Sequence, residues 1–398
     1  MRRLLTPAST LVGIVLATLL ALLTMPLTLP TAQADAGWGT DPPAASQSAT
    51  QGCAQVLFVG VRGSGEQPPY GATVTSVRDA LAAAARADVR VRQVYLDYPA
   101  AQLETLDNAS LERILLTPAG PDSSYFASVT AGVNLLTATI ADSASRCPDE
   151  RVLLVGFSQG AEVITRTLAA HPLGSRLLAA VLIGNPSHYD GQNVQELDGS
   201  AGNRAYGLSS ALYLMRTQAD ASGSTDRTVQ VTSLLRTTFA MVNGEVDSAA
   251  LASAMKSNGS AISATDAPRV YSVCQAGDLV CDSATALTEV LAGQASIDQE
   301  RSTAGAVHGS YAPTGMPKTL AAVTGAIAAL PHVAQPSPPA PLGQTPGQLP
   351  WLPIGVGAVV ALAVLGIMIP RGRHHRHPEH PSSEDIAHQG PSDPWINA

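Results

Sequence analysis

The stretch that most constrains the fold of this chain is Gly-Phe-Ser-Gln-Gly at residues 156–160. It follows a short apolar run at 152–155 and precedes residues 161–170, which have the composition and apolar spacing of a helix. A strand that turns sharply into a helix strains its central serine, and the close packing there requires small flanking residues, which the two glycines supply. We therefore predict that Ser158 lies at the carboxyl edge of a sheet with its hydroxyl exposed.

The amino-terminal end does not have the composition of a globular domain. Two arginines precede an apolar stretch at 11–29, and Ala-Gln-Ala at 32–34 supplies the small residues that a signal peptidase needs. Pro26 and Pro30 would break a helix here before its end, which favours a cleaved signal at 1–34 over an uncleaved anchor. The Ala, Gly, Pro, Ser and Thr residues that dominate 35–52 predict a flexible leader.

A second apolar stretch lies near the carboxyl terminus. Residues 351–369 carry no charge, and as a helix they would be about 28 Å long, close to the roughly 30 Å of a bilayer core. Arginines and histidines follow, so the positive-inside rule places a tail at 371–398 in the cytoplasm and the rest of the mature chain outside. We predict a transmembrane helix at 351–370 after a proline-rich linker at 331–350, and hence a single-pass protein of the cell membrane.

The charge and the cysteines limit the class of protein further. A net charge of -8 without a basic groove gives no reason to expect nucleic acid binding. Cys53, Cys147, Cys274 and Cys281 all lie in the predicted extracellular part, and an even number there predicts two disulfides. Three pairings are possible; a Cys274–Cys281 bond would close a short local loop and leave Cys53 for Cys147. No paired Cys-x-x-Cys with histidines occurs, so we expect no metal.

The middle of the chain predicts an α/β fold. Helical stretches separate apolar runs typical of buried strands, which favours a doubly wound, mainly parallel five-stranded sheet; the runs are 56–61, 89–96, 152–155, 179–183 and 270–273. The domain is predicted to extend over 53–330 and to end with a helix at 319–330. Residues 187–268 do not follow the alternation and are predicted to be a helical insertion, a candidate lid.

A serine hydroxyl becomes a nucleophile only when a base takes its proton and a carboxylate orients that base. In α/β-hydrolases the order along the chain is serine, acid, histidine. His308, in a glycine-flanked loop before the last predicted helix, satisfies this order. His171 lies on the helix of Ser158, His332 lies in the proline-rich linker, and His188 precedes any convincing acid.

Asp278 is the predicted acid, because it directly follows the strand at 270–273. It also lies between Cys274 and Cys281, where a disulfide would hold the carboxylate rigid. The alternative is a simple turn residue after Gly277. The place of Asp278 at the carboxyl end of a strand favours the interpretation that it is a catalytic acid.

An oxyanion hole in such an enzyme uses the amide of the residue after the nucleophile, here Gln159, together with a donor from the loop after an early strand. The start of the helix also directs its partial positive charge at this point. Ser64, in the sequence Arg-Gly-Ser-Gly-Glu at 62–66, is the candidate for the second donor. Taken alone, that sequence is equally consistent with a polar turn.

Together these residues resemble the cutinase family of serine esterases. The resemblance covers Arg-Gly-Ser-x-Glu at 62–66, Gly-Phe-Ser-Gln-Gly at 156–160, Cys-x-x-Gly-Asp-x-Val-Cys at 274–281, and His308. It implies an α/β-hydrolase fold, disulfides joining Cys53 to Cys147 and Cys274 to Cys281, a triad of Ser158, Asp278 and His308, and an oxyanion hole of Ser64 and Gln159. The export signal, alanine-rich composition and membrane tail look like the actinomycete branch.

We therefore expect a membrane-anchored, extracellular carboxylic ester hydrolase that needs no cofactor and acts, as a monomer, on fatty acyl or envelope lipid esters. The insertion at 187–268 departs from the compact family pattern and puts a bulky polyester such as cutin in doubt as the substrate. One alternative is an acyltransferase acting on envelope lipids, which would use the same residues. The other alternative is a non-catalytic lipid-binding surface protein. The presence of Ser158, Asp278 and His308 favours an enzyme over this alternative.

Overall fold

The computed structural model describes residues 37–38, 43–46, 52–102, 115, 124–202 and 204–332. The predicted export signal, transmembrane helix and cytoplasmic tail lie outside these residues, as do most of the leader and nearly all of the proline-rich linker. The described residues belong to one compact unit that ends at His332.

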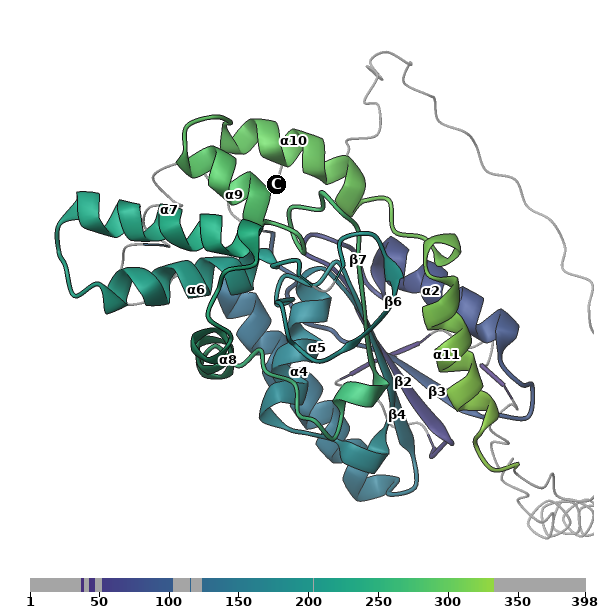
Figure 1. Cartoon of the computed structure of the whole chain (residues 1–398). Coiled ribbons are helices and arrows are strands. Elements are labelled where there is room, and N and C mark those ends of the chain that lie inside the picture. Colours follow the sequence, from purple (N-terminus) through teal and green to yellow (C-terminus); the bar gives the residue numbers. More distant parts are fainter. Residues whose placement is uncertain are drawn as a thin grey trace, which may run out of the picture. The chain divides into compact units, whose positions relative to one another are not determined.

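The centre of this unit is a parallel sheet of seven strands in the order β1-β3-β2-β4-β5-β7-β6 (Figure 1). The strands are β1 (Ala44–Ala45), β2 (Val56–Val61), β3 (Val91–Tyr95), β4 (Arg151–Phe157), β5 (Leu177–Ile183), β6 (Gln195–Gly199) and β7 (Val270–Cys274). The five predicted strands are present, but the predicted number is wrong, because β1 and β6 were not expected. Both are edge strands without an apolar run, so their local sequence carries little strand signal.

Helices cover both faces of the sheet, as in a doubly wound fold (Figure 1). Helices α4 (Ser124–Arg146) and α5 (Gln159–Ala170) pack on one face, and α2 (Gly71–Ala84) and α11 (Pro317–Ala328) pack on the other. Short 3-10 helices occupy Gly174–Arg176, Ala267–Arg269 and Pro313–Gly315. Among the described residues, α4 is long and apolar enough to cross a membrane. Its Leu136 and Ile140 nevertheless lie in the core beside α5, so within this domain α4 is a core helix.

A group of helices that we call the helical cap follows β6 and continues past β7. It consists of α6 (Leu208–Ala221), α7 (Arg227–Asn243), α8 (Ser248–Ser257), α9 (Ala284–Leu291) and α10 (Ile297–His308). The insertion at 187–268 is therefore not purely helical, because it begins with β6. The helices also extend beyond it, since α6, α7, α8 and α9 share one apolar core that includes Leu214, Met255 and Leu287.

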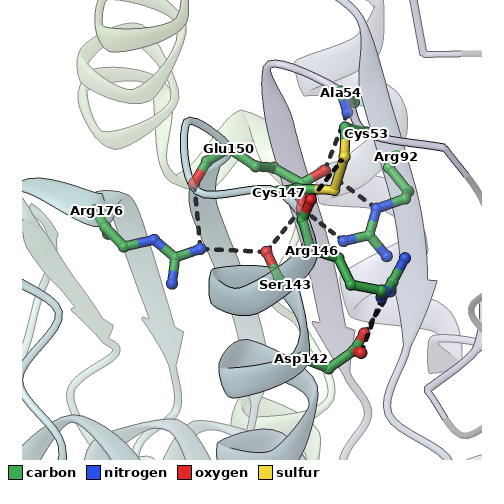
Figure 2. A network of polar contacts seen from close by, with 9 residues as sticks. All are labelled: Cys53, Ala54, Arg92, Asp142, Ser143, Arg146, Cys147, Glu150 and Arg176. Atoms are coloured by element: carbon green, nitrogen blue, oxygen red, sulfur yellow. Dashed lines mark hydrogen bonds and ion pairs between the residues drawn. A yellow bond between two sulfur atoms is a disulfide. The ribbon is translucent and has the colours of Figure 1, made fainter.

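The amino end of the sheet is held by a buried polar network around Glu150 (Figure 2). Arg92, on β3, donates from Nε to Glu150 Oε1 over 3.1 Å and forms an ion pair with its other oxygen. Ser143, on α4, donates to Glu150 Oε2 over 2.7 Å. The disulfide between Cys53 and Cys147 lies beside this network and ties the start of β2 to the end of α4.

Candidate active site

The turn around Ser158 has the close packing that its sequence predicts. Ser158 lies between β4 and α5 with φ 53° and ψ −122°, in the region that non-glycine residues rarely adopt. A Cβ on Gly160 would lie 2.1 Å from the carbonyl oxygen of Val61, and one on Gly156 would lie 2.7 Å from the backbone of Gly160. Only glycine fits at either position, so strand, turn and helix pass as close together as predicted.

The neighbouring strand β5 connects this turn to the predicted acid and base. The backbone N–H of Ser158 donates to the carbonyl oxygen of Ile183 over 2.8 Å. The next residue, Gly184, has φ 55°, and a Cβ there would lie 2.8 Å from His308 Cε1 and 3.3 Å from Asp278 Oδ2. The imidazole and the carboxylate therefore contact the residue next to the one that holds Ser158. Gly184 was not among the predicted site residues; its only signal in the sequence is its place at the carboxyl end of an apolar strand.

His308 and Asp278, which are 30 residues apart in the chain, form a buried pair. The Nδ1 atom of His308 lies 2.9 Å from each oxygen of Asp278, whose side chain is fully buried. The ring of Phe157 stacks on the imidazole with centroids 4.7 Å apart and an interplanar angle of 23°. His308 is the last residue of α10 and not part of a loop, so the prediction of its local structure is wrong. Gly309, directly after His308, is the carboxyl-terminal cap of α10, and the helix extends over residues 297–308 despite Gly305.

Two further groups donate to the Asp278 carboxylate. The Tyr311 hydroxyl donates to Oδ2 over 2.7 Å, and the Val280 N–H donates to Oδ1 over 2.8 Å. The predicted disulfide between Cys274 and Cys281 is present and closes the loop that carries Asp278. Three donors, including His308 Nδ1–H, thus converge on the carboxylate, which is the arrangement that suits an ionised acid.

The side chains of Ser64 and Gln159, whose hydroxyl and backbone N–H are the predicted oxyanion donors, donate to the same carbonyl group. The Ser64 hydroxyl donates to the carbonyl oxygen of Ala101 over 2.7 Å, and Gln159 Nε2 donates to the same oxygen over 3.1 Å. Ser128 Oγ donates to Gln159 Oε1 over 3.2 Å. The structure therefore brings the loop after β2 to the start of α5, next to Ser158.

Arg62 and Glu66 hold the loop that carries Ser64. Arg62 is buried and donates to the carbonyl oxygens of Glu66, Leu96 and Tyr98. The Glu66 carboxylate accepts from the N–H of Gly63 over 2.6 Å and from that of Ala72 over 2.9 Å. These roles were missed in the sequence analysis, although both residues belong to the motif at 62–66. Their spacing alone does not show which distant carbonyl groups they reach.

The other three histidines that the structure describes have different surroundings. His188 is buried with its Nε2 3.2 Å from Glu196 Oε1. Burial lowers the pKa of His188 to about 4 and raises the pKa of Glu196 to about 7. His171 caps the carboxyl end of α5, and the exposed His332 lies 2.8 Å from Asp88.

A strained serine between a parallel strand and a helix, next to a buried histidine–aspartate pair, defines the α/β-hydrolase class. In agreement with this geometry, the family model described as Cutinase matches residues 52–303, more than half of the chain. The chain therefore belongs to the cutinase family and is a serine carboxylic ester hydrolase.

Several solved structures resemble the chain at low sequence identity. An acetyl xylan esterase is 17% identical, with a TM-score of 0.38, and the match covers 69% of this chain and 99% of that one. A cutinase-like protein from Cryptococcus sp. is 16% identical, with a TM-score of 0.40, covering 70% and 97%. The catalytic core domain of an acetyl xylan esterase from Trichoderma reesei is 18% identical, with a TM-score of 0.33, covering 63% and 99%. No curated protein matched the chain.

Proposed function

We propose that Ser158, His308 and Asp278 act as a catalytic triad that hydrolyses esters of fatty acids. The observation that carries this proposal is the buried His308–Asp278 pair, which contacts Gly184 beside Ser158 and stacks on Phe157. The pairing leaves Nε2 as the imidazole nitrogen that takes the serine proton, because Nδ1–H is directed at the carboxylate.

The proposed reaction has two halves. His308 Nε2 removes the Ser158 proton while Oγ attacks the ester carbonyl, and the tetrahedral oxyanion collapses with release of an alcohol that takes this proton. A water molecule, deprotonated by His308, then attacks the acyl-enzyme; the bond from Ser158 Oγ to the acyl carbon breaks, the fatty acid leaves, and His308 returns the proton to Ser158 Oγ. The N–H of Gln159 stabilises the oxyanion, because amides in the first turn of a helix have no intrahelical acceptor. The Ser64 hydroxyl adds a second donor after it rotates away from Ala101.

The test is hydrolysis of p-nitrophenyl esters, from acetate to palmitate, by the full chain in detergent. We expect Ser158→Ala to lower kcat by about 10⁶-fold, as loss of a nucleophile does in other serine hydrolases. The matched control is Ser272→Ala, at a buried serine on β7 whose hydroxyl has no partner among the described residues. Full activity in a folded Ser158→Ala protein would overturn the triad.

The proposed substrate class is lipid, and the helical cap supports it. Phe239 and Val242, on α7, are large apolar residues with exposed fractions of 50% and 46%, a surface suited to acyl chains or a lipid layer. We expect Phe239→Ser and Val242→Ser to reduce hydrolysis of emulsified long-chain esters several-fold and to leave soluble short esters unaffected. The control is Leu197→Ser, at an exposed apolar residue on β6. Equal effects on short and long esters would contradict a lid that contacts lipid.

Deleting the insertion would not test the lid cleanly. The carbonyl oxygen of Tyr206 accepts from the N–H of Ser283, and the N–H of Leu208 donates to the carbonyl oxygen of Val280. The root of α6 is thus bonded to the loop that follows Asp278. A deletion would disturb the proposed acid along with the cap, whereas point changes on the outer face of α7 leave these bonds intact.

The burial of the site favours acyl transfer as a second candidate reaction. Ser158 and His308 are only 6% and 2% exposed, and exclusion of water is what separates a transferase from a hydrolase that uses the same residues. Adding a long-chain alcohol to the assay distinguishes them. A product that is mainly the new ester would identify a transferase, and a product that is mainly the free acid would identify a hydrolase.

A further inference from the structure

Tyr311 occupies a position in the candidate site that the reaction described above does not use. Its side chain is 7% exposed. Its hydroxyl accepts from the N–H of Gln275 over 3.0 Å and donates to Asp278 Oδ2 over 2.7 Å. The ring lies edge-on to those of Phe157 and His308, with centroids 6.0 Å and 6.2 Å away. Both the ring and the hydroxyl therefore contact the residues that orient the base.

The hydroxyl bond has a defined direction. Burial, followed by the nearby negative charge of Asp278, raises the pKa of Tyr311 far above its ordinary value. The phenol therefore keeps its proton throughout the working range of the enzyme. The Tyr311 hydroxyl oxygen already accepts a hydrogen bond from the N–H of Gln275. Its single hydrogen is therefore donated to the carboxylate of Asp278. A neutral donor to an ionised acceptor makes a strong, short hydrogen bond.

We propose that Tyr311 is a positioning residue, which orients Asp278 and withdraws part of its negative charge from His308. This inference rests on the proposed triad. The Asp278 carboxylate shares its charge between His308 Nδ1–H, the Tyr311 hydroxyl and the Val280 N–H. The strength of the Tyr311 bond thus sets how strongly the imidazolium that forms during the reaction is stabilised.

The first variant is Tyr311→Phe, which keeps the ring contacts and removes the hydroxyl. With one donor lost, the carboxylate is held less firmly, and we expect kcat for p-nitrophenyl butyrate to fall about tenfold while KM changes little. The matched control is Tyr125→Phe. Tyr125 is also buried and donates to a buried carboxylate, Glu162 Oε2, over 2.9 Å. That control loses the same kind of bond elsewhere in the domain, so its kcat should stay within about twofold of wild type.

The pH profile separates positioning from packing. Without the hydrogen bond from Tyr311, more of the negative charge of Asp278 faces His308 and stabilises its protonated form. Because the base must be neutral to act, the acid limb of kcat/KM then moves to higher pH. Asp282 is the other acid close to Asp278; burial and the Asp278 charge raise its pKa, while the Gly277 N–H lowers it. Asp282→Asn in both backgrounds therefore checks that the shift does not arise from Asp282. An unshifted limb in Tyr311→Phe would overturn the proposal, as would equal losses of kcat in both Tyr→Phe variants.

A second replacement covers the case in which Tyr311→Phe does not fold. Incorporation of 3,5-difluorotyrosine at position 311 keeps the ring and the hydroxyl but makes the hydroxyl a stronger donor. The acid limb should then move to lower pH, opposite to Tyr311→Phe; no movement would contradict the proposal. Measuring Ser158→Ala in parallel keeps the two claims apart. Full activity in Ser158→Ala refutes the triad itself, whereas loss there with unaffected Tyr311 variants refutes only the role of Tyr311.

Discussion

The two ends of the sheet each bury a carboxylate close to a disulfide, and the partners of those carboxylates differ. At the amino end, Glu150 lies three residues after Cys147 and is paired with Arg92 (Figure 2). At the carboxyl end, Asp278 lies three residues before Cys281 and is paired with His308. Both carboxylates are almost completely buried, with exposed fractions of 1% and 0%.

The difference shows how a buried charge becomes either a structural element or a candidate catalytic group. A guanidinium does not serve as an acid or a base in catalysis, so the buried Arg92–Glu150 pair can only hold α4 and the strands together. An imidazole can both accept and release a proton during a reaction, so His308, oriented by Asp278, has the chemistry of a general base. Burial and geometry are similar at both ends; the chemistry of the partner decides the role.

The largest expected effect concerns the two buried histidines that face carboxylates. His308 faces Asp278 beside Ser158, and His188 faces Glu196. We expect His308→Gln to lower kcat by about 10⁴-fold or more, because no base remains for Ser158. His188→Gln should leave kcat within about twofold of wild type. Ester hydrolysis by the two folded proteins measures both effects. A large loss of kcat only in His188→Gln would show that His188, and not His308, is the base.

An isosteric amide at each carboxylate tests the comparison directly. Asp278→Asn should lower kcat by about 10⁴-fold, because the amide no longer favours the productive tautomer of His308. Glu150→Gln should instead lower the free energy of unfolding by about 3 to 5 kcal/mol, because it leaves Arg92 buried without its counter-charge. Activity per folded molecule should be normal in Glu150→Gln. Urea unfolding and active-site titration measure the two quantities, and a catalytic defect in Glu150→Gln would mean that the two ends are coupled.

The smallest expected effect comes from the His188–Glu196 pair. Burial lowers the pKa of His188 to about 4, so the unfolded chain binds a proton between pH 6.5 and 4 that the folded chain does not, and stability falls as pH falls. Burial raises the pKa of Glu196 to about 7. Between pH 7 and 4.5 the folded chain therefore binds a proton at Glu196 that the unfolded chain does not, and this makes stability rise as pH falls. The two effects largely cancel in the wild type.

Glu196→Gln removes one of these opposing effects. We expect its free energy of unfolding to drop by up to about 3 kcal/mol more than that of the wild type on acidification from pH 6.5 to 4. Urea unfolding at a series of pH values measures the slope. Adding His188→Gln should flatten the slope again. A Glu196→Gln profile parallel to the wild type would contradict the raised pKa of Glu196, and an unchanged slope on adding His188→Gln would contradict the lowered pKa of His188.

Much of the fold could be predicted from local sequence. The elements that could not be predicted have in common that their own residues carry little secondary-structure signal. The five inner strands and the helices α2, α4, α5 and α11 follow from apolar runs and helical spacing. Strand β6, with the sequence Gln-Glu-Leu-Asp-Gly, has no such signal and forms because β7 offers it a free edge. Helix α10 was missed because its residues are mostly polar and glycine lies near its end.

The sequence by itself determined the turn at Ser158, because the need for Gly156 and Gly160 is local and leaves a readable pattern. It also determined the family and, through family motifs, the two disulfides and the order of serine, aspartate and histidine. Only the tertiary structure decided that Gly184, Phe157 and Tyr311 surround His308 and Asp278, and that Arg92 neutralises Glu150. Those contacts join residues far apart in the chain, and their geometry is set by the packing of strands and helices, which no local spacing records.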